Sequence, residues 1–447
     1  MDEGLLMSEY ADINIKKLSL FWFRNYVDSY IVSLLFSVKN LIITPNCKVD
    51  PEDDDSDLYT RYVYKTTVKD AKERLEAQGF SMENFQKVFN ENMLQAIDYS
   101  AFLYHLGVDF NERDEGIQRR TRKKVTFQKW KNAMHKIVSY QLENGNINEH
   151  NSTLPTCITT ECDKIIFYSM ASSCSDSFYG LNTEFIHIAY IVRLILDCCD
   201  SNDEIVLDFS NLGYWDEDCI PQAISATEDV EKTIVLVEGT SDKDILEFAM
   251  QKLYPHLSDL FYFMDFEEAN GAKRAGGTSF IIANIKTFYF SRLKSKFIAI
   301  FDNDAEGYQS QRTLLNEINH WPDNFKILTY PDLPLYRKYP TLAPNGTIMF
   351  DNINKKACSI ELYLPDSIIK ENGEYFPIEW ESRKKIKIAD KIEEAIYQGV
   401  ISQKGEIKKK FYMLCKAIEK GENVFFPDEW ERMKRLLETI IFAFAKE

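Results

Sequence analysis

The chain has 447 residues, of which 45% are hydrophobic and 13% aromatic. This length allows about two to four domains, and the apolar content excludes a chain that is disordered throughout. The formal net charge of −17 repels phosphate, so binding to nucleic acid must rely on local basic patches or on a partner. No apolar run is long enough to cross a bilayer and the N-terminal stretch does not resemble a signal peptide, which predicts a cytoplasmic protein that does not enter a membrane.

Residues 1–110 are predicted to form an N-terminal α+β region. Aromatic and β-branched residues dominate its first forty positions, and an acidic loop rich in Asp follows at 46–57. The pattern then predicts a helix with Thr66 or Thr67 as its N-cap and Gly79 as its end.

Residues 111–228 are predicted to be helical, most clearly over 184–199. The apolar helices suit a dimer interface or a docking surface, and equally a buried core. The nine cysteines include no CxxC pair, so the sequence favours free thiols over a structural zinc site.

A different pattern covers residues 229–345, where short apolar runs alternate with helical segments. The predicted strands are 233–237, 260–266, 296–301 and 325–330. Strands that alternate with helices indicate a four-stranded parallel sheet flanked by helices. A C-terminal extension with a helical tail is predicted over 346–447.

Acidic residues follow two of these strands. Glu238 comes directly after the first strand, and Asp302 and Asp304 come directly after the third. The carboxyl ends of parallel strands meet at one edge of a sheet, and Asp242 at the start of the next helix can turn back toward that edge. Clustered carboxylates repel one another unless cations compensate them, and hard oxygen ligands suit Mg²⁺ or Mn²⁺. The sequence therefore predicts a site for two such ions, at a typical separation of about 3.5–4 Å.

Each part of this pattern also has a structural interpretation. Asp304 can simply cap the helix that follows it. Gly276 and Gly277 can form a loop, or can let backbone N–H groups face a phosphate. Acids at the ends of both the first and the third strand are a rarer combination than either feature alone.

The segment 233–330 resembles a Toprim domain, in which a Glu at the first strand is followed by Asp-x-Asp at a later one. The motifs VEGTSDKD and AIFDNDAEG carry this resemblance, and Asp242 is similar to the second acid of the OLD-type nuclease branch. The stretches RNYVDSY and YVYKTTVKDAKERLEAQGF make the whole chain similar to HEPN/Toprim-associated bacterial proteins. The resemblance implies an N-terminal associated domain and a HEPN-like helical middle before the Toprim core.

The resemblance also implies further site residues. Glu361, in an apolar strand-like run, is expected to complete the metal shell, and Lys404 or Lys409 to stabilise transition-state charge. Independently of the resemblance, two basic patches supply the residues expected to contact nucleic acid, although such runs can equally be solvated faces: Arg119, Arg120, Arg122, Lys123 and Lys124 in the first, and Lys409 in the second. None of the six histidines follows an Arg at the four-to-six-residue spacing of catalytic HEPN ribonucleases, and no P-loop is present.

These features predict a Mg²⁺-dependent endonuclease with Glu238, Asp302, Asp304 and Lys404 as catalytic residues. The resemblance implies that the enzyme takes part in bacterial defence against phage, with DNA or an RNA such as tRNA as its substrate. A homodimer, or a partner protein that supplies a trigger, is a further expectation. Two alternatives stay open, namely a non-catalytic Toprim-fold subunit and a topoisomerase- or primase-type Toprim activity.

Overall fold

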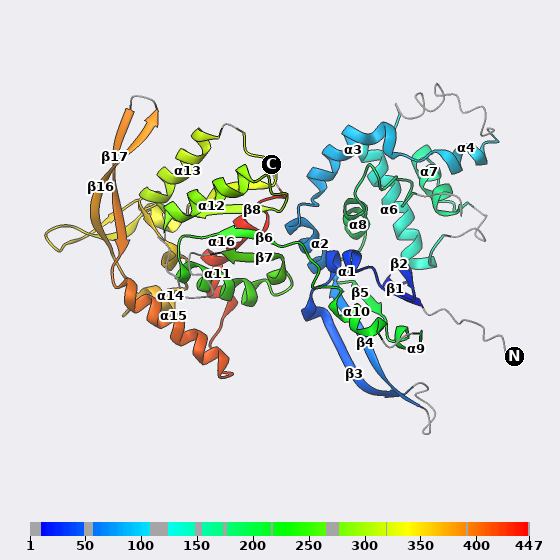
Figure 1. The fold of residues 1–447 in the computed structure, drawn as a ribbon, viewed down its shortest axis with the longest axis horizontal. Coiled ribbons are helices and arrows are strands. Elements are labelled where there is room, and N and C mark those ends of the chain that lie inside the picture. Colours follow the sequence, from blue (N-terminus) through cyan, green and yellow to red (C-terminus); the bar gives the residue numbers. More distant parts are fainter. Residues whose placement is uncertain are drawn as a thin grey trace. The chain divides into compact units, whose positions relative to one another are not determined.

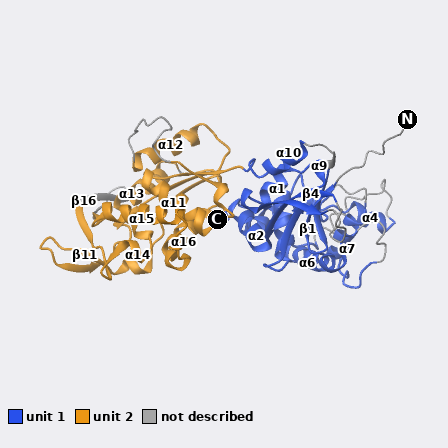
Figure 2. Ribbon diagram, turned by 90° about the horizontal axis from the view of Figure 1, so that it is seen from below, with its two compact units in different colours: residues 1–230, 445–447 blue, residues 231–444 orange. Residues whose placement is uncertain are grey.

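The computed structural model describes residues 10–48, 57–107, 124–147, 154–172, 177–215, 218–264, 277–318, 320–389 and 392–445. The chain forms two compact units (Figure 2), residues 1–230 together with 445–447, and residues 231–444. The four predicted ranges remain a prediction, since the boundary between residues 110 and 111 lies outside the described residues. No described helix is both long and apolar enough to cross a membrane.

The first unit contains a five-stranded antiparallel sheet in the order β2-β1-β5-β4-β3. The strands are β1 Tyr10–Ile15, β2 Leu18–Arg24, β3 Leu41–Lys48, β4 Leu58–Thr67 and β5 Glu204–Asp208. Strand β5 lies in the range predicted to be helical and inserts between β1 and β4. The sequence pattern does not predict it, because five residues give little periodicity and both pairing strands are remote in the chain.

Helices of the first unit pack near this sheet, and the β3–β4 hairpin extends beyond them (Figure 1). Their bounds are α1 Ser29–Leu35, α2 Val68–Ala77, α3 Met82–Ala96, α4 Ser100–His105, α6 Phe127–Asn144, α7 Glu161–Met170, α8 Ile188–Asp197, α9 Leu212–Trp215 and α10 Cys219–Ser225, with a 3-10 turn η1 at Val38–Asn40. Thr67 is the N-cap of α2, as predicted, and its hydroxyl accepts from the N–H of Asp70. One hydrophobic core extends from Ala11 to Ala226, so strands and helices of this unit share a single interior.

The second unit contains the predicted four-stranded parallel sheet, in the order β10-β8-β6-β7. Its strands are β6 Thr233–Leu236, β7 Phe261–Met264, β8 Phe297–Phe301 and β10 Phe325–Thr329, and its crossover helices are α11 Thr240–Leu253, α12 Thr278–Phe290 and α13 Ala305–Glu317. Helices α12 and α13 cover one face and α11 the other (Figure 1). The mixed α/β fold with a parallel sheet is therefore confirmed.

A second sheet of this unit, in the order β12-β11-β16-β17, follows the parallel core. Its strands are β11 Tyr339–Leu342, β12 Ile348–Asp351, β16 Ile378–Ala389 and β17 Ile392–Ile401. The remaining elements are η3 Ser258–Leu260, β9 Asn303–Asp304, η4 Pro334–Arg337, β13 Ala357–Cys358, η5 Ile360–Tyr363, α14 Asp366–Ile369, β14 Lys370–Glu371, β15 Glu374–Tyr375, α15 Lys404–Glu419, η6 Pro427–Trp430 and α16 Glu431–Ile441. Helices α15 and α16 form the predicted helical tail, but the long β16–β17 hairpin is not predicted.

Candidate active site

Glu238 ties the ends of the two central strands together. It lies two residues beyond β6, and its Oε1 accepts a hydrogen bond of 3.0 Å from the backbone N–H of Asp302, directly after β8. Parallel neighbours end at the same edge of the sheet, which is why residues 64 positions apart meet here.

Asp302, Asn303 and Asp304 alternate in direction, as successive residues of an extended segment do. Asp302 is buried beside Glu238. Asn303 points away into the fold, where its side chain donates to Asp332 and accepts from the N–H of Lys355, both at 2.9 Å. Asp304 caps α13, since its Oδ1 accepts from the N–H of Gly307 at 2.7 Å. Asp304 therefore caps the helix and also lies at the carboxylate edge.

Asp242 reaches the same edge from the first turn of α11. Gly239 is the N-cap of this helix, and the N–H of Asp242 donates to its carbonyl at 3.0 Å. The side chain is buried, and its charge interacts with those of Glu238 and Asp302. Four residues after Glu238, one helical turn is enough to return a carboxylate to the strand end.

Glu361 lies opposite two lysines of α15. It belongs to the 3-10 turn η5 rather than to the strand-like run predicted, and its side chain is completely buried. Its Oε2 lies 3.2 Å from Nζ of Lys404 and accepts a hydrogen bond of 2.7 Å from Ser359. Its Oε1 lies 3.5 Å from Nζ of Lys408. Lys404 and Lys408 are one turn apart on α15, so both reach the same carboxylate.

Burial and mutual repulsion favour the protonated forms of the acids. Desolvation, together with the charges of Asp304, Asp242 and Glu306, raises the pKa of Glu238 to about 8. Desolvation and the charge of Glu361 raise the pKa of Asp242 to about 7, against the opposing effect of Lys404. Desolvation followed by the charges of Glu238 and Asp242 raises the pKa of Asp302 well above its ordinary value. Among the described residues, the nearby cations therefore do not fully compensate the charge of these carboxylates.

The surroundings of Lys404 favour its charged form, in contrast to those of the acids. Burial lowers its pKa, but the neighbouring carboxylates of Glu361, Asp302 and Asp242 outweigh this effect and raise it overall. Lys404 therefore stays protonated at neutral pH and presents a positive charge to the acidic cluster.

The donor atoms of the acidic cluster are of the kind that a hard divalent cation prefers. Its members Glu238, Asp242 and Asp302 offer only oxygen donors, and Oδ1 of Asp302 is buried without a hydrogen-bond partner among the described residues. A buried acceptor without a donor is costly unless something binds to it. Mg²⁺ and Mn²⁺ prefer such oxygen donors.

Two supporting residues are not among those predicted. Gln398 on β17 donates to Oδ2 of Asp304 and accepts from the N–H of Glu306 at 3.2 Å. Gly307 lies against the backbone of Asp302, where any Cβ would overlap the carbonyl oxygen. The motif AIFDNDAEG contains Gly307, but only the structure shows why a side chain cannot fit.

Several predicted residues lie elsewhere or outside the described residues. Arg119, Arg120, Arg122 and Lys123 are not among the described residues. Lys124 is exposed in the first unit, and Lys409 is an exposed residue of α15 beside Lys408. The N–H of Gly277 donates to the carbonyl of Glu238 at 2.9 Å, so this group does not face a phosphate as one interpretation of the glycine pair suggested.

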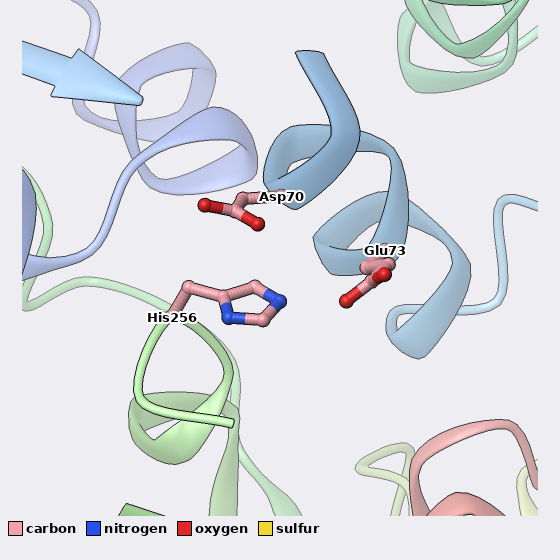
Figure 3. Close-up of side chains that lie close together, drawn as sticks. All are labelled: Asp70, Glu73 and His256. Carbon is pink, nitrogen blue, oxygen red and sulfur yellow. The ribbon is translucent and has the colours of Figure 1, made fainter. Parts of the chain in front are cut away.

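Three further titratable residues, Asp70, Glu73 and His256, are not assigned to a site, because they belong to different units. Asp70 and Glu73 lie one turn apart on α2 in the first unit (Figure 3). His256, also drawn in Figure 3, follows α11 in the second unit. Two partly exposed carboxylates on one helix surface are common without a bound ion.

The N-terminal half of the chain matches a known family. Residues 7–228 match the family model described as HEPN/Toprim N-terminal domain 1, a range that nearly coincides with the first unit. The match associates the chain with HEPN/Toprim proteins and points to a Toprim-related or nuclease-like family. Searches among curated proteins and among solved structures gave no match.

Proposed function

We propose that the second unit is a Mg²⁺-dependent Toprim nuclease of the OLD-type branch, which hydrolyses phosphodiester bonds of DNA or RNA. The observation that carries the proposal is the cluster of carboxylates at the carboxyl ends of β6 and β8, in which Asp242 and Asp302 are buried, with Lys404 beside it. The match of residues 7–228 to a domain of HEPN/Toprim proteins supports the same proposal.

Glu238, Asp242, Asp302 and Asp304 would hold one or two ions, and Glu361 is a further candidate ligand. When bound, such ions supply an activated water and stabilise charge on the attacking and leaving oxygens at phosphorus. The charge of Asp302 interacts with those of Glu238, Asp242 and Asp304, so Asp302 would share the binding of a cation with these carboxylates.

Lys404 is proposed to stabilise negative charge that develops on the phosphate. A cation fixed in a partly dehydrated site stabilises such charge more strongly than one in water. The contact with Glu361 holds the ammonium group of Lys404 in place. Lys408 shares that contact but also donates to Ser241 at 2.9 Å, so it is the more firmly engaged of the two.

A role in antiviral defence extends this proposal from the resemblance to HEPN/Toprim-associated bacterial proteins. The net charge of −17 fits an enzyme whose activity is restrained until a partner or a trigger supplies what the chain lacks. A homodimer or a separate partner protein would meet that need.

Metal-dependent cleavage tests the proposed function. Purified protein is incubated with plasmid, single-stranded DNA, duplex DNA and total RNA, each with Mg²⁺, Mn²⁺ or EDTA. Glu238→Gln and Asp302→Asn are compared with Asp323→Asn, which changes an exposed acid that precedes β10 at the opposite edge of the sheet.

We expect wild type and Asp323→Asn to cut one class of substrate, and EDTA or either site variant to abolish cutting. Cleavage that persists in Glu238→Gln and Asp302→Asn would exclude this site. Wild-type protein that binds metal, measured by calorimetry, and still cuts none of the substrates would favour the non-catalytic alternative.

A further inference from the structure

Two residues of α13, Tyr308 and Arg312, form a cluster with Lys355, which precedes β13, and the proposed mechanism does not use this cluster. Nζ of Lys355 lies 5.3 Å from the centre of the Tyr308 ring, and the guanidinium carbon of Arg312 lies 5.7 Å from the same centre. Lys355 is exposed, while Tyr308 and Arg312 are half-buried. The ring attracts both cations and so limits the positions that their long side chains sample.

The cluster is anchored to the loop that carries the catalytic acids. The N–H of Lys355 donates to Asn303, the residue between Asp302 and Asp304. The next residue, Lys356, forms a β-bridge with Asp304, and the following one pairs with it in the β9–β13 ladder. Tyr308 and Arg312 come one and two turns after Asp304 on α13. Backbone and side-chain contacts therefore fix this cluster next to Asp304.

The distance from the carboxylates to the far end of the cluster corresponds to a short stretch of nucleic acid. Eight residues separate Asp304 from Arg312, which corresponds to about 12 Å along a helix. A stacked strand rises ~3.4 Å per nucleotide along its axis, so Arg312 lies a few nucleotides from the carboxylates. In a chain of net charge −17, two cations held together beside the carboxylates supply the local attraction that phosphate needs.

We propose that Lys355 and Arg312 bind the phosphodiester backbone of nucleic acid beside the carboxylate cluster, and that Tyr308 holds the two cations in position. This proposal rests on the proposed nuclease function, because it names the surface along which the substrate would reach the carboxylates.

Binding measured without cleavage tests the surface separately from the chemistry. Fluorescence anisotropy follows labelled single-stranded DNA, single-stranded RNA and a duplex of the same sequence, with Ca²⁺ in place of Mg²⁺ and with probe integrity checked on gels. Lys355→Ala/Arg312→Ala is compared with Lys252→Ala/Arg435→Ala, which removes the same charge from exposed positions of α11 and α16. Tyr308→Phe and Tyr308→Ala separate the ring from its hydroxyl, and thermal unfolding confirms that each variant is folded.

We expect Lys355→Ala/Arg312→Ala to weaken binding of the preferred probe about tenfold and to reduce the slope of log Kd against log salt by about 1 for each cation. Tyr308→Ala should weaken binding to a lesser extent, and Tyr308→Phe and the charge-matched control should not. A folded double variant that binds like wild type would refute the surface, as would a wild type that binds none of the probes. Wild-type binding that is lost in the double variant, in a protein that cuts nothing with Mg²⁺ or Mn²⁺, would support the surface and favour the non-catalytic alternative over the nuclease.

Discussion

At Gly307 the Asp302 loop passes too close to α13 for any side chain. The carbonyl oxygen of Asp302 occupies the position that a Cβ would take, although the backbone of Gly307 is helical. Helix propensity alone would favour alanine at such a position. The glycine is therefore required by the close approach of the acidic loop, which it allows to pack directly on the first turn of the helix.

Gly307→Ala should lower the free energy of unfolding by about 1–3 kcal/mol, because the backbone of Asp302 must move to accommodate the methyl group. Urea unfolding measures this loss, and metal affinity should fall with it. Gly405→Ala is the matched control, since a Cβ there meets nothing within 4 Å and also lies in the first turn of a helix. The control should be neutral or more stable by up to ~1 kcal/mol, and equal effects of the two substitutions would contradict the packing argument.

Glu361 illustrates a buried charge that two lysines share. Replacing either Lys404 or Lys408 by Met leaves the other ammonium group within reach of the carboxylate. Replacing both leaves a fully buried acid without a cation, which typically costs about 3–5 kcal/mol. We therefore expect the effects of Lys404→Met and Lys408→Met on urea unfolding to be strongly non-additive.

Glu361→Gln in the same double variant serves as the control for this interpretation. Removing the charge should restore much of the lost stability, because the unpaired carboxylate is the source of the cost. Strictly additive lysine substitutions, or a triple variant no more stable than the double, would show that Glu361 does not depend on these lysines.

At the scale of elements, the ends of β6 and β8 bring repelling acids together. In the folded protein the pKa of Glu238 is about 8, whereas an unfolded Glu titrates near 4.5. Between these values the folded state holds more protons than the unfolded state, so stability decreases as pH rises. Below about pH 4.5 both states are protonated, and this loss is absent.

In EDTA, the free energy of unfolding of the metal-free protein should therefore fall between pH 5 and pH 8. That of Glu238→Gln should fall less over the same interval. Urea unfolding at both values measures the difference, and comparison with the variant cancels contributions from other groups. Equal pH dependence in wild type and Glu238→Gln would show that the Glu238 carboxylate is not the source. Mg²⁺ at about a hundred times its Kd should raise the free energy of unfolding by ~2.7 kcal/mol, because it binds only the folded state.

The elements that the sequence predicts well are those with local signals. Alternating strands and helices predict the parallel sheet, and the acids after two strands predict that Glu238, Asp302 and Asp304 lie at one edge of it. The strand-like run around Glu361 is a 3-10 turn, because its burial comes from tertiary packing and not from strand pairing. Gln398 and Lys355 carry no local signal, since each contacts the acidic loop from a segment about 50 residues or more away.

At the scale of the whole molecule, the division into two units predicts independent folding. The first unit has one hydrophobic core that extends from Ala11 to Ala226, and the family match covers the same part of the chain. Residues 1–230 expressed alone should therefore unfold cooperatively in urea. Circular dichroism and fluorescence should report the same midpoint, and a broad transition that differs between the two probes would contradict an autonomous unit.

Strand β5 has a consequence for the order of events during synthesis. It pairs with both β1 and β4, yet it follows β1 by about 190 residues. At a translation rate of about 5–20 residues per second, β5 is synthesised roughly 10–40 s after β1. The β1–β2 and β3–β4 hairpins form early and stay apart until β5 joins them, so during that interval their unpaired edges are open to chaperones or to wrong partners.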